Sequence, residues 1–272
     1  MEDVYVSSWT ELNEQLYAHS WKEDLRRFRS DFAFRGMARA THNLQTSLKR
    51  LEGDYAELEG HLLRNLRKYA HRDSVPGDSI WNWLALAQHH GLPTRLLDWT
   101  YSPYVALHFA TEDLEQYDSD GVIWCVDFVK TNHLLPGKLK AILKKEGSNT
   151  FTVEMLNKVA PSLEVFEKLH PADFVVFFEP PSLDDRIVNQ YALFSMMSNP
   201  SADLDIWLKD YAGLYRGIVI PQMLKWEVRD KLDQANITER VLFPGLDGLS
   251  RWLKRHYSPR TDRRTRERET FS

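Results

Sequence analysis

The 272-residue sequence predicts an α+β fold, a single compact domain whose mixed or antiparallel sheet of short strands is flanked by helices. Segments with helical spacing of apolar residues alternate with short apolar runs typical of buried strands. Hydrophobic residues make up 43% of the chain and charged residues 27%, which indicates a globular protein with a sizeable core. No linker rich in glycine, serine or proline divides it. We therefore expect one domain over residues 1–256 and a polar, basic, disordered tail over 257–272.

The first helix is expected over residues 8–29, where Ser8 can cap the start and Leu12, Leu16, Leu25 and Phe28 supply an apolar face. A second is expected over 54–71, with leucines and tyrosines at helical spacing. Its flank is basic and is either a solvated face or a phosphate contact; the residues are Arg64, Arg67, Lys68 and Arg72.

The remaining elements follow from periodicity, caps and breakers. Gly91 and Pro93 end one helix, and Ser102-Pro103 begins the next with a capping serine and a proline in the first turn. Further helices are expected over 79–89, 136–147, 152–160, 201–212, 221–234 and 245–256. Strands are expected over 31–36, 121–129, 174–178, 185–195 and 217–220.

Charge and composition exclude several classes of protein. The formal net charge of −4 and the pI of about 6.2 exclude a globally basic nucleic-acid binder, but not a local basic patch. The single cysteine, Cys125, excludes an intramolecular disulfide and a cysteine-rich zinc site, and its apolar neighbours predict that it is buried. No apolar run approaches the ~20 residues of a membrane span, and the N-terminus is acidic, so a cytoplasmic protein without membrane partners is expected.

Common catalytic motifs are absent from the sequence. It contains no GxxxxGK[ST], GxGxxG, HExxH or GxSxG. The simplest forms of ATPase, dinucleotide oxidoreductase, zinc protease and α/β-hydrolase are therefore excluded.

Polar residues concentrate instead in a packed segment at 88–102, where they alternate with leucines and a tryptophan. Packed polar groups need partners, so this segment is expected to form a hydrogen-bonded network that shapes the backbone. Arg95 and Asp98 are spaced for an internal ion pair. His89 and His90 could bind a metal with Asp98, but the sequence offers no further ligand, so no metal is expected.

Arg35 is the second candidate. On the predicted strand at 31–36, Phe32 and Phe34 point to one face and Arg35 to the other, while Gly36 ends the strand or opens a turn and leaves space beside the guanidinium. Arg35 could hold a phosphate bidentately. Alternatively, it pairs with Asp98 or another acid and joins the strand to the polar segment.

These residues resemble a known family. Phe34-Arg35-Gly36 resembles the motif that names the FRG domain, and its second, most specific block is similar to the run from His89 through Thr100, continuing into Ser102-Pro103 and Ala106–Ala110. Arg186-Ile187 with Gln190 and Phe194, and then Leu242–Leu246, are similar to later blocks. The resemblance covers roughly residues 25–250.

The first block also resembles the first motif of arginine-type ADP-ribosyltransferases, and this resemblance implies their fold and NAD as substrate. Arg35 would hold the NAD diphosphate, Thr100 or Ser102 would supply the hydroxyl beside the nicotinamide ribose, and Gln190 would occupy the position of the glutamate that binds the ribose 2′-hydroxyl. Gln190 carries no charge to oppose an oxocarbenium ion; Asp98 or Glu179 could substitute for it, although neither lies at the position that the resemblance implies. The candidate catalytic residues are Gln190, Asp98 and Thr100, and the candidate cofactor-binding residues are Arg35, Gly36, Ser102, His90 and Arg95.

The resemblance implies an enzyme that transfers ADP-ribose to a nucleic acid or another macromolecule, in the setting of an intracellular toxin or anti-phage effector with a neutralising partner protein. The basic helix and the tail would suit a nucleic-acid partner. Two alternatives stay open: a non-catalytic module that binds a nucleotide or nucleic acid, and a hydrolase or nuclease that uses His89, His90 and Asp98.

Overall fold

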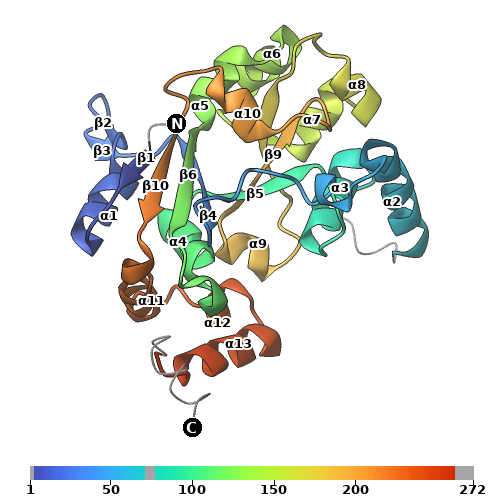
Figure 1. Cartoon of the computed structure of the whole chain (residues 1–272). Helices are drawn as coiled ribbons and strands as arrows, with labels where there is room; N and C mark the ends of the chain where they lie inside the picture. Colours follow the sequence, from blue (N-terminus) through green and yellow to red (C-terminus); the bar gives the residue numbers. More distant parts are fainter. Residues whose placement is uncertain (1–2, 71–76, 261–272) are drawn as a thin grey trace.

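The computed structural model describes residues 3–70 and 77–260 (Figure 1). Within them an eight-stranded mixed sheet forms the centre, in the order β1-β10-β6-β4-β5-β9-β8-β7. The β1/β10 and β7/β8 pairs are parallel and the other pairs are antiparallel. The predicted α+β class and mixed sheet are therefore confirmed. The sheet strands are β1 Asp3–Tyr5, β4 Phe32–Met37, β5 Leu96–Thr100, β6 Gly121–Asp127, β7 Phe151–Thr152, β8 Val175–Glu179, β9 Ala192–Met197 and β10 Tyr215–Ile220.

Helices cover both faces of the sheet (Figure 1). They are α1 Trp9–Tyr17, α2 Tyr55–Tyr69, α3 Ile80–His89, α4 Pro103–Thr111, α5 Phe128–Thr131, α6 Gly137–Glu146, α7 Val153–Val159, α8 Leu163–Glu167, α9 Asp185–Asn189, α10 Leu204–Lys209, α11 Lys225–Gln234, α12 Glu239–Leu242 and α13 Leu246–His256. Two helix boundaries have the predicted residues. Ser102 caps the start of α4, with Pro103 in its first turn, and Gly91 adopts the left-handed conformation after the end of α3 (φ 77°).

The apolar residues of β4 divide between two parts of the core. Phe32 and Phe34 pack with α1, α4 and α11 in a cluster that also buries Cys125, as expected. Ala33 points into a second cluster with α10. A third cluster packs α3, α6, α7 and α8 against β8 and β9. Helices of the first and third clusters flank the place where β4 meets β5.

The long first helix is a wrong prediction. Helix α1 ends at Tyr17, and the chain then forms a two-stranded hairpin, β2 Trp21–Lys22 and β3 Arg27–Phe28. Leu25 and Phe28 are 56% and 60% exposed, so they do not continue the apolar face that Leu12 and Leu16 bury. The prediction relied on the helical spacing of apolar residues alone, and so it extended the helix into residues that do not pack against the core.

Two other predictions need correction. The strand expected over 185–195 is a short helix followed by a strand: Asp184 caps α9, Tyr191 turns the chain with φ 50°, and only then does β9 begin. The packed polar segment contains a strand, β5, which the sequence analysis did not predict because its leucines and Asp98 do not alternate cleanly.

Gly36 does not end the strand; it lies inside β4. A Cβ at this position would lie 1.8 Å from the carbonyl oxygen of Ala106, so helix α4 packs directly on the glycine. The other predicted helices and strands are present, with ends shifted by a few residues. Arg72 and most of the predicted tail (261–272) lie outside the described residues. No helix in 3–70 or 77–260 has both the length and the apolar character that crossing a membrane requires.

Candidate functional site

A cavity of about 310 Å³ lies where β4 and β5 separate. The two strands have a single register pair, Phe34 with Thr100, and β5 continues in register with β9 instead. The volume is at the small end of the range for ligand pockets, about 300–1,000 Å³. The walls come from β4, β5, α3, α4, α9 and β9, and include Arg35, Gly36, His42, Gln88, His89, Asp98, Thr100, Phe109, Glu112, Arg186 and Gln190.

Arg35 bridges the two separating strands. Its Nη1 donates to the backbone carbonyl of Asp98 at 2.6 Å and lies 3.9 Å from the Asp98 carboxylate, so the alternative that joins Arg35 to Asp98 is confirmed as a contact. Burial lowers the pKa of the guanidinium. The Nε–H of Arg35 is buried and finds no hydrogen-bond partner in the described structure. A half-buried guanidinium that lines a cavity and retains an unsatisfied donor is suited to an anionic ligand.

Asp98 is held from the other side by a chain of side-chain hydrogen bonds. Thr94 Oγ1 donates to Gln88 Oε1 at 2.6 Å, and Gln88 Nε2 donates to Asp98 Oδ2 at 2.7 Å. The network predicted for residues 88–102 is therefore present. It orients a carboxylate that is 59% exposed, next to Arg35.

Thr100, Ser102 and Gln190 lie close together, but their polar groups are used structurally. Thr100 Oγ1 donates to the Gln190 carbonyl at 2.7 Å and accepts from the Ser102 amide at 3.0 Å. Ser102 Oγ caps α4 through the Val105 amide. Gln190 Nε2 donates to the Leu242 carbonyl at 2.9 Å. Thr100 and Gln190 line the cavity, whereas Ser102 does not.

Arg95 lies apart from this cavity. Its guanidinium is buried and contacts Glu59, which is 1% exposed, and Glu167 at 2.7 Å. The predicted Arg95–Asp98 ion pair is therefore wrong. Arg95, just before β5, pairs with the two glutamates, whereas Asp98, within β5, contacts Arg35 and Gln88. The two glutamates raise the pKa of Arg95 against the opposing effect of burial. The sequence offered no signal for Glu59 or Glu167.

The two histidines do not join Asp98. His89 Nε2 lies 2.8 Å from Asp184 Oδ2, and its ring contacts that of His90 edge to face. Burial lowers the pKa of His89 more than Asp184 raises it. His90 does not line the cavity. Among the residues that the structure describes, no group of three or more histidine, cysteine, aspartate or glutamate side chains is arranged to hold a metal.

A second carboxylate in the cavity, Glu112, was missed by sequence reasoning. It follows α4, and its Oε2 lies 3.4 Å from Nε2 of His108, one helical turn earlier. His108 is fully buried, and its Nδ1 lies 2.8 Å from Nη1 of Arg229, which is also fully buried. Arginine can only donate, so Nδ1 accepts and neutral His108 carries its proton on Nε2, facing Glu112. Only the i, i+4 spacing of His108 and Glu112 could have indicated the pair.

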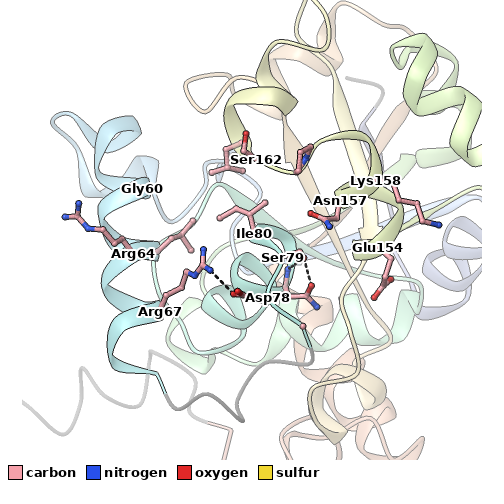
Figure 2. Close-up of a pocket in the computed structure, with 15 residues that line it drawn as sticks. Gly60, Arg64, Arg67, Asp78, Ser79, Ile80, Glu154, Asn157, Lys158 and Ser162 are labelled. Carbon is pink, nitrogen blue, oxygen red and sulfur yellow. Dashed lines mark hydrogen bonds and ion pairs between the residues drawn. The ribbon is translucent and has the colours of Figure 1, made fainter.

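A larger and more open groove, of about 990 Å³, lies between α2, α3, α7 and α8 (Figure 2). Arg64 and Arg67 of the predicted basic flank border it. Figure 2 shows Arg67 reaching Asp78, at 2.7 Å, while Arg64 extends away from the groove. Asp78 and Glu154 offset the positive charge there. We therefore place the candidate site in the smaller cavity.

The fold and this cavity define an α+β protein whose central sheet separates around an arginine and two carboxylates. Residues 30–119 match the family model of the FRG domain, which supports the FRG family for this chain. The matched segment contains Arg35, Asp98 and Glu112. No curated protein and no solved structure matches the chain.

Proposed function

We propose that the cavity binds the nicotinamide-ribose and phosphate part of NAD and that the protein transfers ADP-ribose to a macromolecular acceptor. One observation carries the proposal: Arg35, a half-buried cation whose Nε–H has no partner in the described structure, lines the same cavity as two carboxylates, Asp98 and Glu112. The arginine suits a phosphate and a carboxylate suits a cationic sugar.

The reaction breaks the glycosidic bond between the ribose and the nicotinamide nitrogen. The bonding electron pair leaves with nicotinamide, and the ribose carbon becomes an oxocarbenium ion. An acceptor nucleophile then forms the new bond at that carbon and loses its proton. The charge that develops on the ribose needs an opposite charge within the cavity.

Glu112 is the better candidate for that charge. The Nε2–H of His108 faces the Glu112 carboxylate. Arg229 donates to Nδ1 of His108 and thereby determines its tautomer. Asp98 is already shared between Arg35 and Gln88. Gln190 is uncharged and its amide nitrogen donates to the Leu242 carbonyl, so it does not supply that charge.

A second candidate function is a non-catalytic nucleotide-binding module. The same Gln190 contact favours it, since an uncharged side chain engaged with the backbone occupies the position where the resemblance implies a glutamate. In that case Arg35 binds the phosphate and NAD stays intact. The proposed setting, a toxin or anti-phage effector with a neutralising partner, applies to the transferase.

The test incubates the full chain with NAD labelled in the adenylate part and cell lysate, followed by nuclease or protease treatment. We expect label in a macromolecular fraction, lost in Arg35→Ala and in Glu112→Gln. Arg35→Ala should also lose NAD binding, whereas Glu112→Gln should retain it. Intact NAD that is nevertheless bound in an Arg35-dependent way would establish the binding module instead. NAD that is neither bound nor consumed would contradict both functions.

The control is Arg39→Ala, which removes a nearby arginine that contacts Gln116 and does not line the cavity. It should leave NAD binding and label transfer unchanged. Thermal midpoints of all variants separate loss of the ligand from loss of the fold.

A further inference from the structure

Two arginine side chains lie over the ring of Phe243, the residue immediately after α12. The guanidinium carbon of Arg186 lies 5.0 Å from the ring centroid and that of Arg251 lies 4.0 Å from it. The ring also contacts Phe109 and His108 of α4, at centroid distances of 6.2 and 6.3 Å. Phe109 and Arg186 line the candidate cavity, so Phe243 connects the cavity wall to helix α13.

Neither arginine is neutralised. In the described chain neither Arg186 nor Arg251 forms an ion pair, and Arg186 donates only to the backbone carbonyl of His89, at 3.3 Å. Arg255, on the same helix as Arg251, behaves differently: it pairs with Asp233 and Glu239. The face of an aromatic ring attracts each guanidinium but does not neutralise its charge.

Hydrogen bonds and close packing fix the backbone around the Phe243 ring. Asn189 Nδ2 donates to the Val241 carbonyl and Gln190 Nε2 to the Leu242 carbonyl, both at 2.9 Å, which ties α9 to α12. Figure 1 shows α9 beside α12, with α13 packed below. Gly248 allows α13 to pack closely, since a Cβ there would lie 1.8 Å from the Phe243 carbonyl oxygen. These contacts fix the backbone segments that bring Arg186 and Arg251 to the Phe243 ring.

We propose that Arg186 and Arg251 form an anion subsite that binds a phosphate or phosphodiester group of a ligand extending out of the cavity. Planar guanidinium groups can donate to phosphate oxygens, and a phosphate anion would neutralise their charges. The phosphate belongs either to a nucleotide or to a nucleic-acid strand. The subsite rests on the proposed function only in that Arg186 and Arg35 line the same cavity.

The test titrates the full chain with adenosine, AMP, ADP, inorganic pyrophosphate and a single-stranded oligonucleotide, by calorimetry at fixed ionic strength. Arg251→Ala should weaken ADP and pyrophosphate binding about tenfold or more, since charge-assisted hydrogen bonds are lost, and should leave adenosine unchanged. Arg251→Lys should keep part of the affinity that Arg251→Ala loses, because lysine retains the positive charge but lacks the planar pair of donors. Loss of affinity for the oligonucleotide alone would assign the phosphate to a strand.

Arg240→Ala is the matched control. Arg240 also lies over an aromatic ring of the same C-terminal segment, 4.7 Å from the Trp252 centroid, but does not line the cavity. The Arg240→Ala variant should bind each probe with the same affinity as the unmodified chain. ADP bound with equal affinity by Arg251→Ala overturns the subsite and leaves the proposed function standing. Pyrophosphate bound through Arg251 without any nucleotide binding keeps the subsite and overturns the proposed function. Equal losses in Arg251→Ala and Arg240→Ala indicate a general basic surface and overturn the subsite.

Discussion

At the residue scale, two arginines with similar predicted roles occupy different environments. Arg35 contacts a backbone carbonyl and an exposed carboxylate at the cavity, and retains a donor without a partner. Arg95 is enclosed by two glutamates, one of them fully buried, and has no access to the cavity. A buried arginine with matched carboxylates stabilises the fold only as a complete set, because each unpaired charge is costly. Arg95 is thus a structural residue and Arg35 a candidate ligand-binding one.

A pair of isosteric variants tests this assignment. Glu59→Gln should lower the free energy of unfolding by about 3–5 kcal/mol, since it removes the buried partner of Arg95. Asp98→Asn should change it little, because Asp98 is exposed and does not contact Arg95. Chemical denaturation of both variants measures the difference. If Asp98→Asn unfolded at lower denaturant concentration and Glu59→Gln did not, the result would support the Arg95–Asp98 ion pair that the spacing predicted.

At the scale of elements, the site depends on how closely α4 approaches β4. Gly36 permits that approach, since the Ala106 carbonyl lies where its side chain would be. Helix α4 in turn positions Phe109 and Glu112 on the cavity wall. The glycine of the Phe-Arg-Gly motif therefore has a packing role, beyond the space beside Arg35 that the sequence suggested.

Gly36→Ala should destabilise the protein by about 1–3 kcal/mol or more, because backbone must move on both sides of the contact. Gly60→Ala is the control. Gly60 lies exposed within α2, and a Cβ added there would meet no atom of a neighbouring element within 4 Å, so the variant should gain up to about 1 kcal/mol from helix propensity. Thermal or denaturant unfolding reports both values. A neutral Gly36→Ala would show that α4 can withdraw from β4 without cost.

At the scale of the whole molecule, three histidines with lowered pKa values link stability to pH; His108 is fully buried, His89 is half-buried and His42 is exposed. Desolvation lowers the pKa of His42, His89 and His108 below the ordinary value of 6.5. The unfolded chain therefore binds more protons than the folded protein below about pH 6.5, and the free energy of unfolding decreases as the pH falls through that window. Above pH 6.5 the three groups no longer affect it.

The midpoint temperature of thermal unfolding should thus decrease as the pH is lowered from 6.5 to 5. His108→Gln should flatten this decrease, since His108 is fully buried between Arg229 and Glu112 and can be protonated only against the nearby Arg229 charge. Glutamine keeps an N–H donor toward Glu112. Scanning calorimetry across this range measures the slopes. An unchanged slope in His108→Gln would assign the dependence to His42 and His89.

Much of the fold was determined by local sequence: the caps at Ser8 and Ser102, the stop at Gly91, and the apolar runs of β6 and β8. These features depend on neighbours within a few residues, which periodicity and cap chemistry describe. The Phe34-Arg35-Gly36 strand and the polar network at 88–102 were also predictable, and with them one wall of the cavity.

Only the tertiary structure decided which of these polar groups meet. Arg95 finds Glu59 and Glu167, His89 finds Asp184, and Arg229 reaches His108 across 121 residues of chain. Arg186 and Arg251 meet on Phe243 in the same way. Charges act through space, and a sheet brings together strands that are distant in the sequence. Periodicity indicates which face a residue occupies but carries no information about the partner opposite it.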